Sequence, residues 1–299
     1  MAKDNPDLGI FTRRDEFLSR ATQRLGTHPS DFQTASGRIA ASAKTNLPCL
    51  AAGVLLPLLF REPSRNDHPQ KDGQFMFQLI KRSALVPQPG DLSCPGGILH
   101  PFWDRFLRLF LLHGPLSVNR GTAGGPTNRR GAELSGIIGL FLANALREAW
   151  EETRLPPYRV RFLGPLPTYS LQRFRRTIFP LAGYVTGSWN PKPNREVERL
   201  VEIPLASFYR DELFGCLNLS YADSSTPDGR ASAQHPCLVH RDPGGAEEIL
   251  WGATFNIIVQ FLGIVMDYRL PSWQDGRTIN RTLGSDYLTG RKGSAPVLP

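Results

Sequence analysis

The chain has 299 residues, 40% of them hydrophobic, and a formal net charge of +8 at pH 7. This apolar content is enough for a folded core, which excludes disorder throughout. No run approaches the roughly 18 uncharged apolar residues of a membrane-spanning helix, and the first residues lack the order of a signal peptide. We therefore expect a cytoplasmic protein without a membrane partner. The four cysteines stand far apart, which argues against a disulfide framework and a structural zinc site.

The positive charge attracts any polyanion. The basic residues are dispersed along the chain rather than gathered in a long tract. We therefore expect an anionic small molecule, and not nucleic acid, as the partner.

Residues 1–45 are polar and are expected to form an N-terminal extension. One helix is predicted near residues 15–25, because Phe17, Leu18, Ala21 and Leu25 recur at helical spacing. Apolar runs at residues 49–60 and 74–80, separated by a polar turn, predict two paired core strands.

Residues 102–112 predict an amphipathic helix rich in aromatic residues, and residues 114–131 a loop rich in Gly, Asn, Thr and Arg. Long loops inside a domain are usually functional or disordered. The aromatic helix is expected to pack against its own domain, with a homodimer contact and binding to a membrane surface as the alternatives.

Further along the chain, the pattern predicts a helix over residues 135–154, strands near 160–163 and 178–185, and a last helix over 247–265. Residues 270–299 are rich in Gly, Ser, Thr, Arg and Pro, which is typical of a mobile segment. The expected division is an extension at 1–45, one domain at 46–266 and a flexible tail at 267–299.

Three glutamates mark the 135–154 helix as a candidate site. At about 100° per residue, Glu148, Glu151 and Glu152 fall on one arc, opposite an apolar arc. Like charges placed in this way repel one another unless a cation neutralises them. On these residues alone an ordinary solvated acidic face is the commoner explanation; the alternative is a site for Mg²⁺ or Mn²⁺, which prefer carboxylate oxygens.

The flanking residues favour the metal site. Residues 147–155, Arg-Glu-Ala-Trp-Glu-Glu-Thr-Arg-Leu, resemble the second half of the Nudix box, and Pro95-Gly96-Gly97 resembles the glycine turn that opens it. Within the Nudix superfamily the chain looks like the coenzyme A diphosphatase group. The matching stretches are Leu79-Ile80-Lys81-Arg82-Ser83, the Glu196-Val197 to Pro204-Leu205 segment, and Trp251-Gly252-Ala253-Thr254. They occur in family order between residues 48 and 266.

The resemblance implies an α/β/α sandwich around a mixed sheet. It also implies a pyrophosphatase in which Glu148, Glu151 and Glu152 hold Mg²⁺ or Mn²⁺, with Glu148 either a ligand or the general base. Glu196 is either a further metal ligand from a second loop or a surface glutamate. Arg147 is expected to orient a carboxylate, with exposed pairing along the helix as the alternative. Arg82, Gly96 and Gly97 are expected to contact the substrate.

The chain also departs from the family pattern. An insertion, placed at residues 98–138, interrupts the box, and Gly139 stands eight positions before Arg147 where the family has its first glutamate. Asp104 or Glu133 could replace that glutamate, but both are expected to be ordinary surface acids. Arg154 stands where the box closes with glycine, which is unfavourable if the helix ends there with a positive φ.

The substrate is the weaker inference. The expected substrate is coenzyme A or an acyl derivative; the alternatives are another nucleoside-diphosphate compound, such as ADP-ribose, a dinucleotide or a nucleoside triphosphate, and a degenerate Nudix domain used only for binding. The stretch from Leu85 to Pro89 lacks the positive charge that this group usually carries. Arg173, Arg175 and Arg176 could supply substitute phosphate contacts or form a solvated basic turn.

Overall fold

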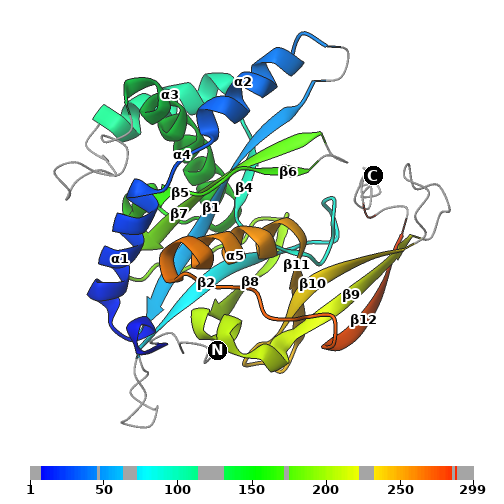
Figure 1. Cartoon of the computed structure of the whole chain (residues 1–299). Helices are drawn as coiled ribbons and strands as arrows, with labels where there is room; N and C mark the ends of the chain where they lie inside the picture. The colour runs from blue at the N-terminus through cyan, green and yellow to red at the C-terminus, as the bar shows by residue number, and fades with distance from the viewer. Residues whose placement is uncertain are drawn as a thin grey trace, which may run out of the picture.

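The computed structural model describes residues 8–45, 48–62, 73–113, 131–171, 175–221, 232–284 and 287 (Figure 1). The predicted loop at residues 114–130, Arg173, and the last residues of the predicted tail, 288–299, lie outside this set. Within it, eight strands form one sheet and four strands form a second.

The central sheet is mixed. Strands β1 (Leu50–Arg61) and β2 (Gln74–Arg82) form the predicted pair and run antiparallel, and β7 (Arg176–Val185) runs parallel to β1 on its other side. The middle of β1 is buried along eight consecutive residues, as expected for a continuous apolar run in a sheet covered on both faces. The remaining strands of this sheet are β3 (Leu92–Ser93), β4 (Gly96–Ile98), β5 (Val160–Pro165), β6 (Tyr169–Leu171) and β8 (Val197–Pro204).

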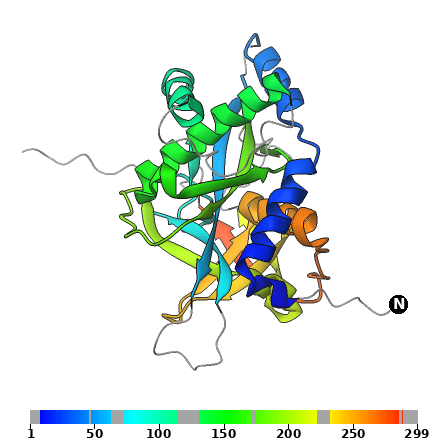
Figure 2. The same ribbon diagram turned by 90° about the vertical axis from the view of Figure 1, so that its left-hand side faces the viewer.

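Helices cover both faces of the sheet (Figure 2). One face carries α2 (Phe32–Ser42) and α4 (Ala132–Thr153), which pack with β1, β5 and β7 in one hydrophobic core. The other carries α1 (Arg14–Thr27) and α5 (Gly252–Met266), which pack with β2 and β8 in a second core. Helix α3 (Pro101–His113) lies against α4. The predicted α/β/α sandwich around a mixed sheet is confirmed.

The N-terminal segment is part of the domain. The predicted helix near residues 15–25 is present as α1, and its Phe17 ring lies 4.4 Å from the ring of Phe75 on β2 and 6.5 Å from that of Phe261 on α5. Helix α2, which the sequence did not predict, buries Phe32 against Phe179. Residues 8–45 therefore complete both cores instead of extending away from them.

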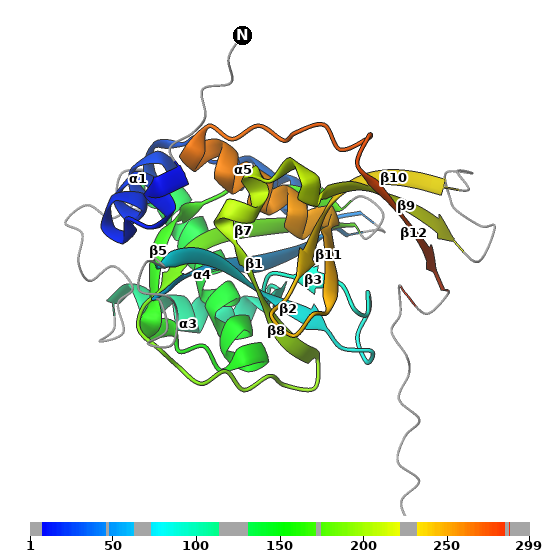
Figure 3. The same ribbon diagram turned by 90° about the horizontal axis from the view of Figure 1, so that it is seen from below.

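A second sheet stands beside the first, on the side of α5 (Figure 3). It consists of β9 (Phe214–Tyr221), β10 (Ser232–Arg241), β11 (Glu247–Trp251) and β12 (Arg277–Leu283). Two predictions are corrected here. The last helix begins only at Gly252, because residues 247–251 pair with β10, and residues 277–283, expected in a flexible tail, pair in parallel with β9.

Helix α3 is only partly packed. Asp104 is completely buried, whereas Phe102, Trp103, Phe106 and Leu109 are more than half exposed. The expectation that the aromatic helix packs against its own domain is met on one face only. No helix within the described ranges is long and apolar enough to cross a membrane.

Candidate functional site

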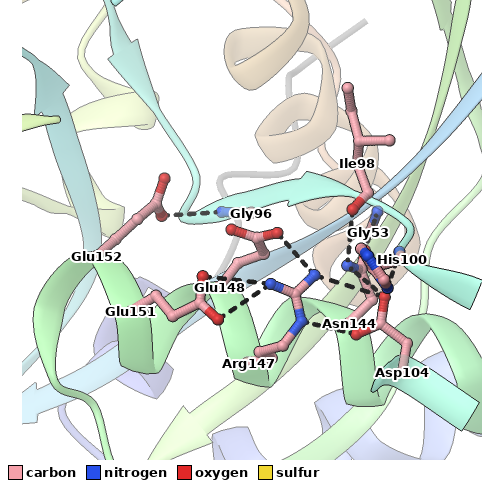
Figure 4. Close-up of polar contacts among 10 residues, drawn as sticks. All are labelled: Gly53, Gly96, Ile98, His100, Asp104, Asn144, Arg147, Glu148, Glu151 and Glu152. Carbon is pink, nitrogen blue, oxygen red and sulfur yellow. Dashed lines mark hydrogen bonds and ion pairs between the residues drawn. The ribbon is translucent and has the colours of Figure 1, made fainter. Parts of the chain in front are cut away.

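The two halves of the split motif meet in space. Strand β4 crosses in front of the C-terminal half of α4 (Figure 4), where the Gly96 N–H donates to Glu152 Oε2 at 3.0 Å. A Cβ on Gly97 would lie 2.4 Å from the carboxyl carbon of Glu148. Only a residue without a side chain lets this carboxylate lie against the strand. The glycine turn and the glutamate helix thus form one site.

A buried amide sets this close approach. Asn144 on α4 accepts a hydrogen bond from the Gly53 N–H of β1 at 2.7 Å and donates to the Ile98 carbonyl of β4 at 3.3 Å. A Cβ on Gly53 would lie 2.6 Å from Asn144 Oδ1. Asn144 is completely buried, so it fixes α4 against both strands with its polar groups satisfied. Sequence reasoning missed this residue, because an asparagine in an apolar helix face carries no spacing signal.

Asp104 is not the surface acid that the sequence suggested. It is completely buried, accepts hydrogen bonds from Asn144 Nδ2 at 3.0 Å and the His100 N–H at 2.6 Å, and pairs with Arg147 Nε at 2.8 Å. A buried carboxylate needs such partners. Glu133, the other candidate, accepts instead from Gln33 of α2 at the opposite end of α4.

Arg147 joins three carboxylates. Besides Asp104, it contacts Glu148 at 2.9 Å and Glu151 at 3.1 Å (Figure 4). Burial alone would lower the pKa of Arg147, but the hydrogen bond to Asp104 and the charge of Glu148 reverse the sign, so that its pKa is raised. The side chain of Arg147 is only 17% exposed. Its contacts therefore fit a residue that orients carboxylates better than one that forms an exposed ion pair along the helix.

Glu148 and Glu152 are desolvated and adjacent. Burial is the largest cause that raises the pKa of Glu152, and the charge of Glu148 raises it further. The hydrogen bond from Gly96 lowers it, and the net result is a pKa of about 8. Burial also raises the pKa of Glu148, against the neighbouring charge of Arg147. Two adjacent carboxyls that are largely kept from water suit a hard divalent cation, which would neutralise both.

Glu151 and Glu196 lie less favourably for a metal. Glu151 is 49% exposed and turned toward Arg147, and Glu196 is exposed in the loop before β8, close enough for its charge to raise the pKa of Glu152. In the part of the chain that the structure describes, no three His, Cys, Asp or Glu side chains are gathered closely enough to hold a metal ion. Glu148 and Glu152 are thus the donors in place, and the other two would have to turn.

The raised pKa of Glu152 predicts a pH-dependent stability. The folded protein binds this proton up to about pH 8 and the unfolded chain only up to about pH 4.5. Stability is therefore full below the lower value and falls as pH rises through the upper one, by up to a few kcal/mol at roughly 1.4 kcal/mol per pKa unit. Thermal melts in EDTA should show this decline, and Glu152→Gln should flatten it. A melting temperature of the wild type that is constant from pH 5 to pH 8 would contradict the assignment.

A cavity of about 290 Å³ opens beside the glycine turn. Gly96, Gly97, Arg82 and Arg176 line it, together with side chains of both sheets and α5. Arg175, predicted to bind substrate, is not among the lining residues; it lies in the turn before β7 with a φ of 47°. Of the predicted substrate contacts on described residues, Arg82, Gly96 and Gly97 are brought together.

The far wall of the cavity is built by the second sheet. Asp91 accepts hydrogen bonds from Trp251 Nε1 at 3.3 Å, Arg281 Nη1 at 2.6 Å and the Tyr287 hydroxyl. Trp251 and Tyr287 both line the cavity, and Arg281 lies over both rings. Sequence reasoning missed this cluster because its members are up to 196 positions apart.

Helix α4 ends with the left-handed backbone conformation that suits the glycine of the Nudix box, although the residue here is Arg154. Arg154 caps α4 in the left-handed conformation, with φ 61° and ψ 27°, and its N–H donates to Trp150 O at 2.9 Å. This is the position where glycine has no steric cost, whereas a residue with a Cβ costs about 1 kcal/mol. The guanidinium lies 5.5 Å from the Trp150 ring centroid, a contact that offsets part of this cost.

The close contact at Gly97 predicts a separation of activity from stability. In Gly97→Ala the new Cβ meets the far end of the Glu148 side chain, which can turn away at little cost to folding. Displacing a reacting carboxylate by about 1 Å can cost roughly a hundredfold in rate. We expect a near-normal melting temperature and strongly reduced diphosphate hydrolysis. Gly37→Ala, where a Cβ meets nothing within 4 Å, is the control.

Comparison with known proteins supports the resemblance seen in the sequence. Over 127 residues the chain is 28% identical to the mouse peroxisomal coenzyme A diphosphatase NUDT7; the match covers 42% of this chain and 50% of that protein. The chain thus spans about half the length of this curated relative. No family model matches. The match supports the predicted resemblance to the coenzyme A diphosphatase group of the Nudix superfamily, at low identity and across half of the relative's length.

Solved structures give a distant likeness. A Nudix hydrolase from Nitrosomonas europaea shares 12% identity with a TM-score of 0.33, over 80% of this chain and 91% of that one. The Nudix domain of Shewanella oneidensis NrtR, solved with ADP-ribose, shares 16% identity with a TM-score of 0.30, over 56% of this chain and 83% of that one.

Proposed function

We propose that this protein is a pyrophosphatase that hydrolyses the diphosphate linkage of coenzyme A or an acyl-CoA-type derivative by attack of water on phosphorus. The observation that carries the proposal is the convergence of Gly96 and Gly97 with Glu148 and Glu152 at the edge of a cavity. The choice of coenzyme A is supported by the sequence stretches of that group and by the name of the mouse relative.

In this proposal Glu148, Glu151 and Glu152 hold Mg²⁺ or Mn²⁺, with Glu196 as a further ligand. The desolvated pair Glu148 and Glu152 fits such an ion. When bound, the ion would supply charge neutralisation of the diphosphate and a lowered pKa of the attacking water. Glu148 serves as a ligand or as the group that takes the proton of that water.

The remaining residues position the reacting groups. Arg147 holds Glu148 and Glu151 through its guanidinium and is itself held by the buried Asp104. The Gly96 N–H fixes one oxygen of Glu152. The absence of side chains at Gly96 and Gly97 lets β4 lie directly against β1 and against the Glu148 carboxylate.

Two alternatives remain. Another nucleoside-diphosphate compound, such as ADP-ribose, a dinucleotide or a nucleoside triphosphate, would use the same carboxylates, and the aromatic rings of Trp251 and Tyr169 in the cavity would suit any nucleobase. A domain used only for binding is favoured by one observation: Glu151 is engaged by Arg147 and, among the described residues, no group of ligands is assembled for a metal.

One assay separates these functions. The purified protein, with Mg²⁺ or Mn²⁺, is offered coenzyme A, an acyl-CoA, ADP-ribose, diadenosine polyphosphates and nucleoside triphosphates, and the products are resolved by chromatography. We expect the highest kcat/KM for coenzyme A or its acyl derivative. A higher value for another compound would replace the substrate, and a complete lack of turnover would leave the binding domain.

The cytoplasmic location and the homodimer stay predictions. The mouse relative is named peroxisomal, so imaging of the tagged full chain has to decide between the two compartments. The exposed aromatic side chains of α3 are the face that a second copy would cover. Sedimentation of the wild type and of Trp103→Ser would show a dimer that the substitution weakens.

A further inference from the structure

Two arginines of the cavity lack carboxylate partners. Within the described ranges, neither Arg82 nor Arg176 forms an ion pair, and the contact of Arg82 is a hydrogen bond from Nε to the Pro87 carbonyl at 2.8 Å. Arg176 Nε is buried without a hydrogen-bond partner. Both residues line the cavity, so positive charge has been placed where no protein group neutralises it.

A second group without a hydrogen-bond partner belongs to the same cavity. Ser93 also lines it, and its Oγ is buried without a hydrogen-bond partner. A buried donor without a partner destabilises the folded state. Two such donors in one cavity therefore point to an acceptor that arrives from outside the chain.

Charge interactions show that Arg82 lies near both Arg176 and Glu152. Burial, and then the charge of Arg82, lowers the pKa of Arg176, so the two guanidiniums are near each other. Arg82 in turn lowers the pKa of Glu152, against the larger effect of burial. Arg82 is thus close enough for its charge to act on both Glu152 and Arg176. Arginine is the side chain best suited to a phosphate group.

We propose that Arg82, Arg176 and Ser93 form a phosphate-binding site in the cavity, distinct from the carboxylates of α4. This inference rests on the proposed function. Of the two phosphates in the diphosphate linkage of the substrate, the one that lies toward the cavity would bind at Arg82. A terminal phosphomonoester of the substrate shares this chemistry and is distinguished below. Arg176 is one of the three arginines that the sequence offered as substitute phosphate contacts, and it lines this cavity.

Binding is measured without turnover. The full chain in EDTA is titrated with inorganic pyrophosphate, coenzyme A and dephospho-coenzyme A by calorimetry. We expect Arg176→Gln to weaken binding about tenfold to a hundredfold, because a charge-assisted hydrogen bond is lost. Arg161→Gln, an exposed arginine of β5, is the matched control and should bind like the wild type. Equal losses for both coenzyme A forms and for pyrophosphate indicate the linkage; a loss confined to coenzyme A indicates the terminal phosphate.

Stability provides the second readout. Without ligand, Arg176→Gln should melt at the wild-type temperature or above it, because an unpaired, half-buried charge near Arg82 is removed. Wild-type affinity for all three compounds in Arg176→Gln would overturn the site, and a lowered melting temperature with that affinity would assign Arg176 to packing. These outcomes do not depend on hydrolysis. A protein that binds pyrophosphate through Arg176 but cleaves nothing would refute the proposed function alone.

Discussion

Replacement of Glu152 by glutamine is expected to lower diphosphate hydrolysis by about a thousandfold, the upper end of the roughly 10²–10³ lost when one electrostatic stabiliser of the transition state is removed. Glu152 is 5% exposed and its carboxylate is held by the Gly96 N–H. Glutamine retains an oxygen that can accept this hydrogen bond but removes the charge that would hold a divalent cation. The loss should therefore appear in rate and metal affinity, with the fold preserved.

The measurement is kcat/KM for coenzyme A over a range of Mg²⁺ concentrations, together with circular dichroism. Glu212→Gln, which changes an exposed glutamate in the short 3-10 helix Asp211–Leu213, should leave both unchanged. If Glu152→Gln turned over at the wild-type rate, α4 would not be the catalytic helix. If it failed to fold, Glu148→Gln on the same helix would provide the same comparison.

The parts of the fold that follow local periodicity were predictable. Strands β1 and β2 were predicted from short continuous apolar runs, and helix α1 from apolar residues three to four positions apart; both patterns reflect which side chains are buried. The glutamates of α4 were also predictable, since the recognition motif is contiguous there. Its counterpart at Gly96 and Gly97 was found because the short glycine turn is itself a motif.

Strand β12 was not predictable for a physical reason. Its sequence, Arg-Thr-Ile-Asn-Arg-Thr-Leu, alternates little in polarity, and most of its side chains stay exposed. Its place is set by pairing with β9 and by the contact of Arg281 with Asp91, neither of which leaves a local pattern. The predicted last helix wrongly included strand β11, because the apolar residues of β11 continue directly into α5. The strand ends and the helix begins at Gly252, which has a positive φ.

Asp104 shows the same limit at the site itself. Forty-two residues separate it from Arg147, so no spacing connects them, and an aspartate at the start of a helix is usually exposed. The packing of α3 on α4 brings the two together.

Replacement of Asp104 by asparagine should therefore destabilise the protein by about 3 kcal/mol, because the largely buried Arg147 loses its innermost partner. The asparagine NH2 would also replace one carboxylate oxygen, so that it faces either Arg147 Nε, which contacts Oδ1, or the Asn144 Nδ2 and His100 N–H groups, which donate to Oδ2. Denaturant unfolding at pH 7 measures the loss. Glu133→Gln, at the opposite end of α4, should change stability by less than about 0.5 kcal/mol.

A double-mutant cycle with Arg147→Met tests whether the effect passes through Arg147. If Asp104 acts by holding Arg147, the double variant should lose less free energy of unfolding than the sum of the two single variants. The reason is that either substitution alone already breaks the contact between the two residues. Hydrolysis should fall in Asp104→Asn as well, by about tenfold to a hundredfold as for other groups that orient ligands, because Glu148 and Glu151 are placed by the same guanidinium. Additive stability losses with unchanged hydrolysis would make Asp104 a packing residue, and the missing acid of the motif would have to be sought elsewhere.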